Sequence, residues 1–243
     1  MGIEDLDLVF VGDIHGELKE LVWRAIHQYK LKDTNIVVLG DFGVGFNKPA
    51  YIEQLYKKLE PKLLKNNLTI YTIRGNHDDP IYFDGKHDFD RLIFLKDYIP
   101  VEISGSKILP IGGAVSIDQK LRKVFNEKME KYGSSKRSWW PDEGVTKISE
   151  KELPSSVDII ISHCAPISFE PIYIRNDFDR DLILDTWMKV LDERNYLEKT
   201  VKNNVRFKYW FFGHYHRSVS GNYGDMLYRG LDIMEFYYYW KEN

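Results

Sequence analysis

Short apolar, β-branched runs alternate with amphipathic stretches along the first half of the chain. The runs at residues 6–11, 36–39 and 68–73 predict buried strands, and the stretches at 18–29 and 51–65 predict helices with one apolar face. Each predicted strand is followed by a glycine and then by polar side chains. Strands that alternate with covering helices are typical of an α/β sheet, so we expect the α/β fold class.

The second half of the chain repeats this pattern less regularly. Continuous apolar runs at 157–161 and 207–212 predict two further strands, and strand signals recur over 96–111. Residues 116–132 predict a helix, and residues 228–239 are expected to finish a second sheet. The aromatic tail from Phe236 to Trp240 could complete a core strand or meet a partner subunit, and the core strand is the commoner case.

Two long excursions, at about 117–153 and 167–204, separate predicted strands by more than a turn requires. We expect these cap-like segments to shape a substrate site, since long ordered loops in compact domains commonly carry function. The chain shows no internal repeat and no low-complexity linker. Its 243 residues can bury one substantial core, so we expect a single domain over residues 1–243.

Charge, cysteine content and hydropathy restrict the partners and the location that we expect for this protein. The formal charge of -3 gives no global basic footprint that would indicate nucleic-acid binding. Cys164 is the only cysteine, which excludes an internal disulfide and fits a reducing compartment. No apolar run is long enough to span a membrane, and the first residues do not resemble a signal peptide, so we expect a cytoplasmic protein.

Candidate metal ligands follow five of the predicted strands. In α/β sheets the carboxyl ends of strands are where ligands collect. Oxygen and imidazole donors without a thiolate pair suit Mn, Fe, Zn or Mg rather than a structural zinc, and there are enough of them for two ions. The five motifs are Gly12-Asp13-Ile14-His15-Gly16, Gly40-Asp41-Phe42-Gly43, Gly75-Asn76-His77-Asp78, Ser162-His163-Cys164-Ala165-Pro166 and Gly213-His214-Tyr215-His216.

The ordered series of motifs resembles the calcineurin-like metallophosphoesterase superfamily. Each motif alone is a weak signal, but five in the family's order and with compatible spacing, from Asp13 to His216, are not expected by chance. The resemblance implies a calcineurin-like phosphoesterase fold, in which a two-sheet β-sandwich is flanked by helices. It also implies a dimetal site on the loops that follow the carboxyl ends of the strands.

The resemblance assigns seven metal ligands and one catalytic histidine, His77. A carboxylate can span two ions about 3.5–4 Å apart, which places between them a bridging hydroxide that attacks phosphorus. His77 would assist the leaving group without binding metal. Manganese is the metal expected first, with iron, zinc, nickel or magnesium as alternatives. Asp13, His15 and His216 would hold one ion, Asn76, His163 and His214 the other, and Asp41 would bridge both.

The chain departs from the protein phosphatases of the superfamily at one motif. Those enzymes read GDxxDRG, in which the second Asp orients the catalytic histidine and the Arg grips phosphate. Here Val44 and Gly45 replace both residues. The departure weakens the interpretation as a phosphoprotein phosphatase, and it leaves Asp78 or Asp79 as candidates to orient His77.

Substrate-binding candidates lie in the first excursion. Arg122, Arg137 and Trp139 combine cations with a flat aromatic surface, which could hold a phosphate and stack on a base. Acidic residues such as Glu127 and Glu130 are interleaved with them, so a solvated helix with an aromatic anchor is the more ordinary interpretation. Arg122 is the first candidate to replace the missing phosphate-gripping arginine.

These observations predict a metal-dependent phosphoesterase that hydrolyses phosphate monoesters or diesters. One alternative is a phosphoprotein (Ser/Thr) phosphatase. Another, of a different class, is a catalytically silent binding module that keeps the fold; the seven intact ligand positions favour the enzyme. The expected partner is a phosphorylated small molecule, a nucleotide or a nucleic acid, with no membrane and no obligate protein partner.

Overall fold

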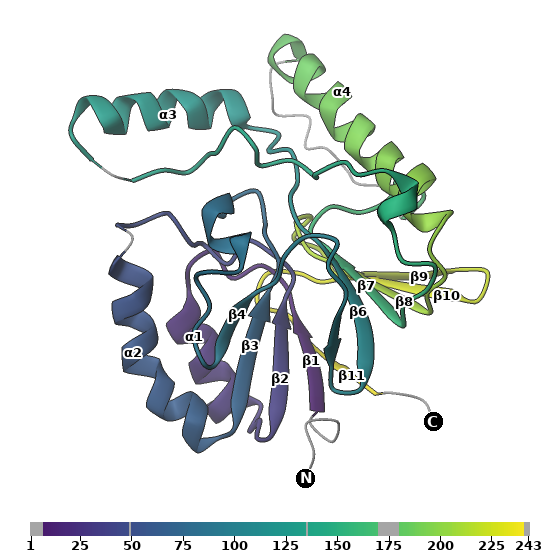
Figure 1. Cartoon of the computed structure of the whole chain (residues 1–243). Coiled ribbons are helices and arrows are strands. Elements are labelled where there is room, and N and C mark those ends of the chain that lie inside the picture. The colour runs from purple at the N-terminus through teal and green to yellow at the C-terminus, as the bar shows by residue number, and fades with distance from the viewer. Residues whose placement is uncertain (1–6, 49, 135, 170–179, 241–243) are drawn as a thin grey trace.

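Two β-sheets pack face to face, and helices lie on their outer faces (Figure 1). The computed structural model describes residues 7–48, 50–134, 136–169 and 180–240, so part of the second excursion, 170–179, lies outside the described residues. The two layers of sheet with flanking helices confirm the predicted fold class. Among the described residues, no helix is long and apolar enough to cross a membrane.

The first sheet has five strands in the order β11-β1-β2-β3-β4. Strands β1 to β4 are parallel, and β11 is antiparallel to β1. Parallel pairing brings the polar residues that follow β1, β2 and β3 to one edge of the sheet. The strands are β1 (Asp7–Val11), β2 (Thr34–Val38), β3 (Leu68–Thr72), β4 (Leu92–Phe94) and β11 (Phe236–Tyr239).

The second sheet has six strands in the order β5-β6-β7-β8-β10-β9. Its centre, β6, β7, β8 and β10, is parallel, and antiparallel partners close both edges. The strands are β5 (Val101–Ile103), β6 (Ser106–Ile111), β7 (Ile159–Ser162), β8 (Tyr209–Phe212), β9 (Val219–Tyr223) and β10 (Met226–Gly230).

The prediction that residues 228–239 finish the second sheet is wrong for their second half. β10 belongs to that sheet, but β11 pairs with β1 in the first sheet. Aromatic residues occupy both faces of β11: Tyr239 packs on Phe10 between the sheets, and Tyr238 packs on Tyr29 on the helix side. Both faces of β11 therefore meet core residues, and the tail completes a core strand.

Strand alternation divides the core into three parts. In β1, Leu8 and Phe10 face the second sheet, whereas Val9 and Val11 face the helices. Because both faces are buried, the strand is apolar throughout, as the sequence indicated. Helices α1 (Leu18–Trp23), which continues as a π-helical turn (Arg24–Gln28), and α2 (Ala50–Lys65) supply apolar residues to the first outer cluster.

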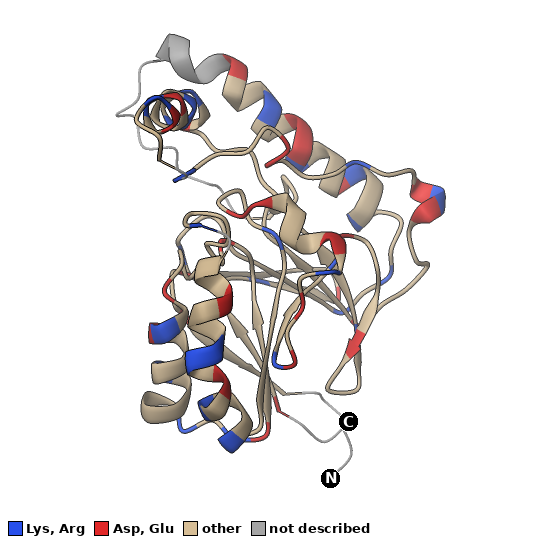
Figure 2. Ribbon diagram, turned by 60° about the vertical axis from the view of Figure 1, so that its left-hand side comes forward, with Lys and Arg blue, Asp and Glu red and all other residues tan. Residues whose placement is uncertain are grey.

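The two excursions lie beyond the carboxyl ends of the parallel strands (Figure 1). Helix α3 (Gln119–Lys131) falls inside the predicted range, while α4 (Arg180–Tyr196) and its π-helical turn (Leu197–Lys202) were not predicted, since the apolar residues of α4 are not gathered on one face. Short 3-10 helices occur at Pro80–Asp84 and Glu150–Glu152. Figure 2 shows both charge signs on α3 and on the coloured part of α4, so these described parts form no basic surface.

Candidate metal centre

The seven predicted ligands lie on loops that follow β1, β2, β3, β7 and β8. Four of them, His15, Asp41, His214 and His216, have positive φ angles between 46° and 70°. This conformation is uncommon for residues other than glycine, and surrounding structure must hold it in place. Backbone strain of this kind, repeated in one region, is typical of a functional site.

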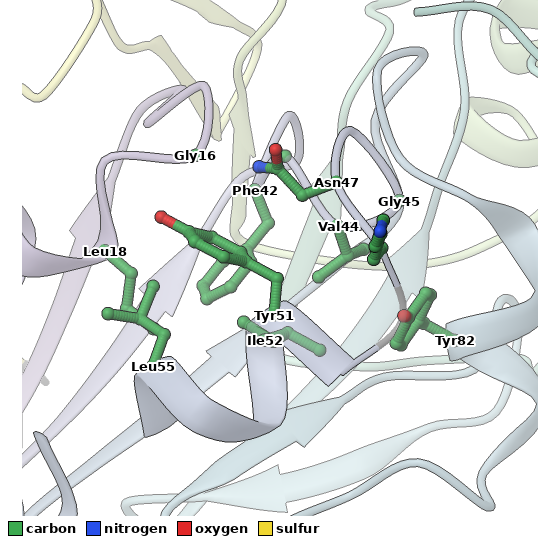
Figure 3. A pocket seen from close by; sticks show the side chains of 12 residues that line it. Gly16, Leu18, Phe42, Val44, Gly45, Asn47, Tyr51, Ile52, Leu55 and Tyr82 are labelled. Carbon is green, nitrogen blue, oxygen red and sulfur yellow. The ribbon is translucent and has the colours of Figure 1, made fainter. Parts of the chain in front are cut away.

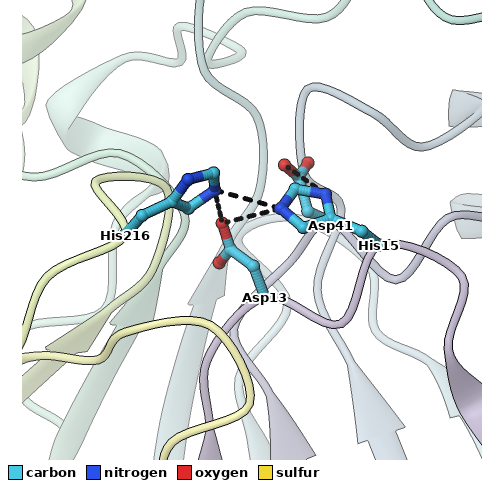
Figure 4. A group of neighbouring side chains, drawn as sticks. All are labelled: Asp13, His15, Asp41 and His216. Carbon is cyan, nitrogen blue, oxygen red and sulfur yellow. Dashed lines mark hydrogen bonds and ion pairs between the residues drawn. The ribbon is translucent and has the colours of Figure 1, made fainter.

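Four ligating side chains form one group (Figure 4). One ligand atom from each of Asp13, His15, Asp41 and His216 lies within 4.8 Å of the others. His216 Nε2 is 3.1 Å from Asp13 Oδ2 and 3.0 Å from His15 Nε2. Two carboxylates and two imidazoles that converge in this way suit a divalent transition metal.

The other predicted ligands gather on the far side of Asp41. His163 Nε2 is 2.9 Å from Asn76 Oδ1 and 3.2 Å from Asp41 Oδ1. The His214 ring lies 5.0 Å from the His163 ring, centroid to centroid. The second oxygen, Asp41 Oδ2, is 3.6 Å from His15 Nδ1, so the carboxylate stands between the two groups.

Hydrogen bonds orient these side chains from behind. His163 Nδ1 donates to the carbonyl oxygen of Leu39 at 2.7 Å, which leaves Nε2 facing the group. The backbone N–H of His214 donates to Asp13 Oδ1 at 3.0 Å. Such partners fix the tautomer and direction of metal ligands.

Glycine precedes several ligands because no larger residue would fit. A Cβ atom at Gly75 would lie 2.0 Å from the Asp41 nitrogen, and one at Gly213 would lie 2.4 Å from Asp13 Oδ1. These backbones pass close beside the carboxylates. The glycines noted in the motifs therefore have a packing reason.

Burial and charge shift the pKa values of the group in opposite directions. Burial lowers the pKa of His163, but the Asp41 and Asp13 carboxylates and the Leu39 carbonyl together outweigh this effect and raise the pKa to about 9. Burial would raise the pKa of Asp41, yet His163 holds it well below its usual range. Asp41 is therefore an anion, and its buried charge favours nearby cations.

His77 lies beside this group. Its backbone N–H donates to Asp41 Oδ1 at 2.8 Å, and its Nε2 is 3.9 Å from Asp41 Oδ2. Burial lowers the pKa of the imidazole. The Phe46 ring lies 6.1 Å from the His77 ring, and Trp140 stacks on Phe46 at 6.4 Å. The first excursion thus reaches the histidine through Trp140.

The hypothesis that Asp78 or Asp79 orients His77 is wrong. Asp78 accepts hydrogen bonds from the backbone N–H groups of Phe42, Gly43, Val44 and Gly75 at 2.6 to 3.1 Å. Asp79 instead accepts from the N–H of Ile81. Asp78 consequently holds the Asp41 loop against the Asn76 loop.

The three substrate-binding candidates lie in two places. Arg122 Nε donates to Asp118 Oδ1 at 2.7 Å, and its charge lowers the pKa of His77, so it lies within electrostatic reach of the centre. Arg137 and Trp139 line an open cavity of about 620 Å³ between α3 and residues 136–141. Lys123 Nζ covers the Trp139 ring at 4.4 Å, which leaves one face less free for a base.

A small pocket lies between α2 and the loops that carry His15 and Asp41 (Figure 3). Its volume is about 20 Å³. A water molecule needs roughly 10–15 Å³ by this measure, whereas ligand pockets start near about 300 Å³. This pocket is therefore too small for a phosphorylated substrate. It is lined by Gly16, Leu18, Phe42, Gly43, Val44, Gly45, Asn47, Lys48, Tyr51, Ile52, Leu55 and Tyr82.

Two buried polar residues near the centre were missed by the sequence reasoning. Ser116 Oγ accepts from Asn76 Nδ2 at 2.9 Å and donates to Glu143 Oε2 at 2.6 Å. Glu143 is only 4% exposed although it comes from the first excursion. Its position in a polar, mixed-charge segment gave no sequence signal of burial.

The free energy of unfolding of the metal-free protein is expected to depend on Glu143. Burial raises its pKa from 4.5 to about 7. The unfolded chain releases this proton first as pH rises, so the wild type should lose stability between pH 4.5 and 7. The free energy of unfolding of Glu143→Gln should not fall over this range. The fall in the wild type is at most about 3 kcal/mol, because one pKa unit corresponds to about 1.4 kcal/mol. Urea unfolding of both proteins across this pH range measures the difference. If the free energies of unfolding of the two proteins changed in parallel with pH, the prediction would be wrong.

Comparison with known proteins identifies the family. The model of the calcineurin-like phosphoesterase family matches residues 6–218. The chain therefore belongs to the calcineurin-like phosphoesterase family, and it is a hydrolase that acts on ester bonds, as the motifs predicted. A search of curated proteins found no match.

Three solved structures are similar to this chain at low sequence identity. The phosphopantetheinyl hydrolase of Mycobacterium tuberculosis is 13% identical with a TM-score of 0.42, over 96% of this chain and 91% of that one. GAP50, the anchor in the inner membrane complex of Plasmodium, is 12% identical with a TM-score of 0.40, over 93% and 71%. A putative 5'-nucleotidase from Staphylococcus aureus is 10% identical with a TM-score of 0.42, over 94% and 49%.

Proposed function

We propose that this protein hydrolyses phosphate mono- or diesters with two divalent metal ions. The observation that carries the proposal is the position of Asp41 between two groups of ligating side chains. One of its oxygens is 3.2 Å from His163 Nε2, and the other is 3.6 Å from His15 Nδ1. A carboxylate so placed can bridge two cations.

Two bound cations would supply a deprotonated water near neutral pH and offset the charge that grows on the phosphate. Manganese is the metal we propose first, because carboxylate, amide and imidazole donors suit it. The protein's part is to fix these donors, which buried hydrogen bonds and positive φ angles do here. The proposed ligands are Asp13, His15 and His216 for one ion, Asn76, His163 and His214 for the other, and Asp41 for both.

His77 is proposed to assist the leaving group. Its N–H bond to Asp41 Oδ1 fixes the backbone, so the ring stays beside the bridging carboxylate. An imidazole can hold a proton at one nitrogen and give it to an alkoxide oxygen as the ester bond breaks.

The proposed substrate is a phosphorylated small molecule, a nucleotide or a nucleic acid. The mixed charges on the excursion helices and the formal charge of -3 favour a small substrate over a long polyanion. The missing GDxxDRG completion argues against a phosphoprotein phosphatase. The single cysteine, Cys164, supports a reducing location such as the cytoplasm.

The deciding experiment is turnover of matched p-nitrophenyl mono- and diesters after loading with Mn²⁺. Preference for the diester would direct the search to diesters of nucleotides, and preference for the monoester would favour phosphorylated metabolites. Activity should disappear with a chelator and return with Mn²⁺. A wild-type protein that binds the metal but turns over neither ester would instead support a binding module.

Arg122→Ala is expected to lower kcat/KM by roughly 10- to 100-fold, the effect of one charged hydrogen bond to phosphate. The matched control is Arg24→Ala, since Arg24, the first residue of the π-helical turn after α1, makes the same kind of bond to Glu20, also 2.7 Å long and four residues away. Both variants lose a helix ion pair, but only the first should affect steady-state kinetics. Equal kinetics in the two variants would remove Arg122 from the proposed substrate site.

A further inference from the structure

The set of metal ligands does not by itself determine which way the side-chain amide of Asn76 is turned. Its oxygen and its NH2 group have nearly the same shape, but only the oxygen can bind a cation. A rotation of half a turn about the last side-chain bond would point two N–H donors at the metal centre. Some neighbouring group must therefore select one orientation.

We propose that Glu143, acting through Ser116, is the positioning residue that fixes the Asn76 amide with its oxygen toward the metal centre. The inference rests on the proposed function, because Asn76 is a metal ligand only in that proposal. Asn76, Ser116 and Glu143 are only 2%, 2% and 4% exposed, so water does not compete for their hydrogen bonds.

The direction of the hydrogen bonds follows from the chemistry of the carboxylate. Above its pKa of about 7, Glu143 is ionised and can only accept, and it accepts from the Ser116 hydroxyl at 2.6 Å and from the Ser116 N–H at 3.1 Å. The hydroxyl has one proton, so its oxygen remains an acceptor on the other side. Asn76 Nδ2 must then donate to it, as it does at 2.9 Å, and Asn76 Oδ1 turns toward His163 Nε2 at 2.9 Å.

Glu143 itself is anchored to the strand end that carries Asn76. Its carbonyl oxygen accepts from Arg74 Nη1 and from the N–H of Ala114, both at 3.0 Å. Arg74 is 4% exposed and stands two positions before Asn76 in the chain. The first excursion and the loop after β3 therefore form one connected unit.

A second buried carboxylate provides a matched control. Glu193 of α4 is 3% exposed and accepts from the N–H of Val115 at 2.9 and 3.1 Å. It also accepts from the N–H of Val145 at 3.4 Å and from Cys164 Sγ at 3.5 Å. Glu193 thus supports the backbone next to Ser116, but its bonds do not lead to the Asn76 amide.

The test is titration of the metal-free 243-residue chain with Mn²⁺ by calorimetry at about pH 8, where Glu143 is ionised. A glutamine amide in place of the Glu143 carboxylate cannot accept from the Ser116 hydroxyl and N–H together, because one of its two ends is a donor. Glu143→Gln should weaken one of two Mn²⁺ equivalents by about 10- to 100-fold and leave the other nearly unchanged. Ser116→Ala should give the same loss, and the double variant should lose no more than either single one.

Glu193→Gln is expected to lower the melting temperature without affecting either Mn²⁺ equivalent. If it weakens the same equivalent as Glu143→Gln does, the effect is general loosening of the loop and the inference is overturned. If the wild type binds two equivalents and Glu143→Gln binds both as tightly, the inference about Glu143 is overturned while the proposed function stands. A wild type that binds no second equivalent would overturn the inference together with the proposed function.

Discussion

Asp41→Asn is expected to lower kcat/KM by at least about 10³-fold and to remove tight binding of at least one Mn²⁺. An asparagine has nearly the same shape, but it offers one neutral oxygen where the carboxylate offers two charged ones. The two groups of ligands would lose the anion between them. Metal ions contribute several kcal/mol to such reactions, and each 1.4 kcal/mol or so is tenfold in rate.

The residue's surroundings make this substitution informative. Asp41 is 1% exposed, and one oxygen also accepts the N–H of His77. An asparagine oxygen can keep that bond, and asparagine tolerates the positive φ of 47° at this position. The backbone is therefore expected to stay in place while the charge is lost.

Asp33→Asn is the matched control. Asp33 also has a positive φ, 49°, and lies just before β2, but its side chain is exposed and bonds to Asn67. Both variants should be made, and Mn²⁺ binding measured by calorimetry together with ester hydrolysis. If Asp41→Asn keeps two tight Mn²⁺ equivalents and wild-type kcat/KM, the bridging role of Asp41 is wrong.

His77→Asn is expected to lower kcat by about 10²- to 10⁴-fold while both Mn²⁺ ions remain bound, the usual range for loss of a general acid. The effect should depend on the leaving group. A p-nitrophenolate leaves without much help, so loss of a proton donor matters little. An alkoxide leaves slowly unless it is protonated, so alkyl esters should show the larger loss.

This dependence separates two possible roles of His77. If the imidazole only stabilised charge on the phosphate, p-nitrophenyl and alkyl esters would lose activity equally. The control is His87→Asn, since His87 lies outside the motifs, with a side chain 39% exposed beside Asp84. Metal content must be measured for each variant, because a loss of Mn²⁺ would show that the substitution had disturbed the Asn76 loop instead.

The sequence was most informative where residues close together in the chain carry both structure and chemistry. The five strands that precede the ligands were predicted from their apolar runs, and each ligand lies within a few residues of the end of its strand. Strand polarity then requires these ends to meet at one edge. The convergence of Asp13, His15, Asp41 and His216 was therefore predictable before any coordinates.

Contacts between distant segments were much less predictable. Nothing in the run from β10 to β11 indicated that the chain leaves one sheet for the other, because aromatic strands suit both. The role of Asp78 was misassigned for a similar reason. Its neighbour along the chain is His77, but three of its four backbone bonds go to the loop after β2, more than thirty residues away.

By itself, the sequence determined the fold class, the family and the positions that offer metal ligands, because apolar runs and short motifs are local properties. Only the tertiary structure decided that β11 pairs with β1, that Asp78 binds backbone N–H groups, and that Glu143 reaches Asn76 through Ser116. Each of these depends on which surfaces meet when distant segments bury their apolar side chains. Burial then turns ordinary polar residues into specific hydrogen-bond partners, since water is no longer available to them.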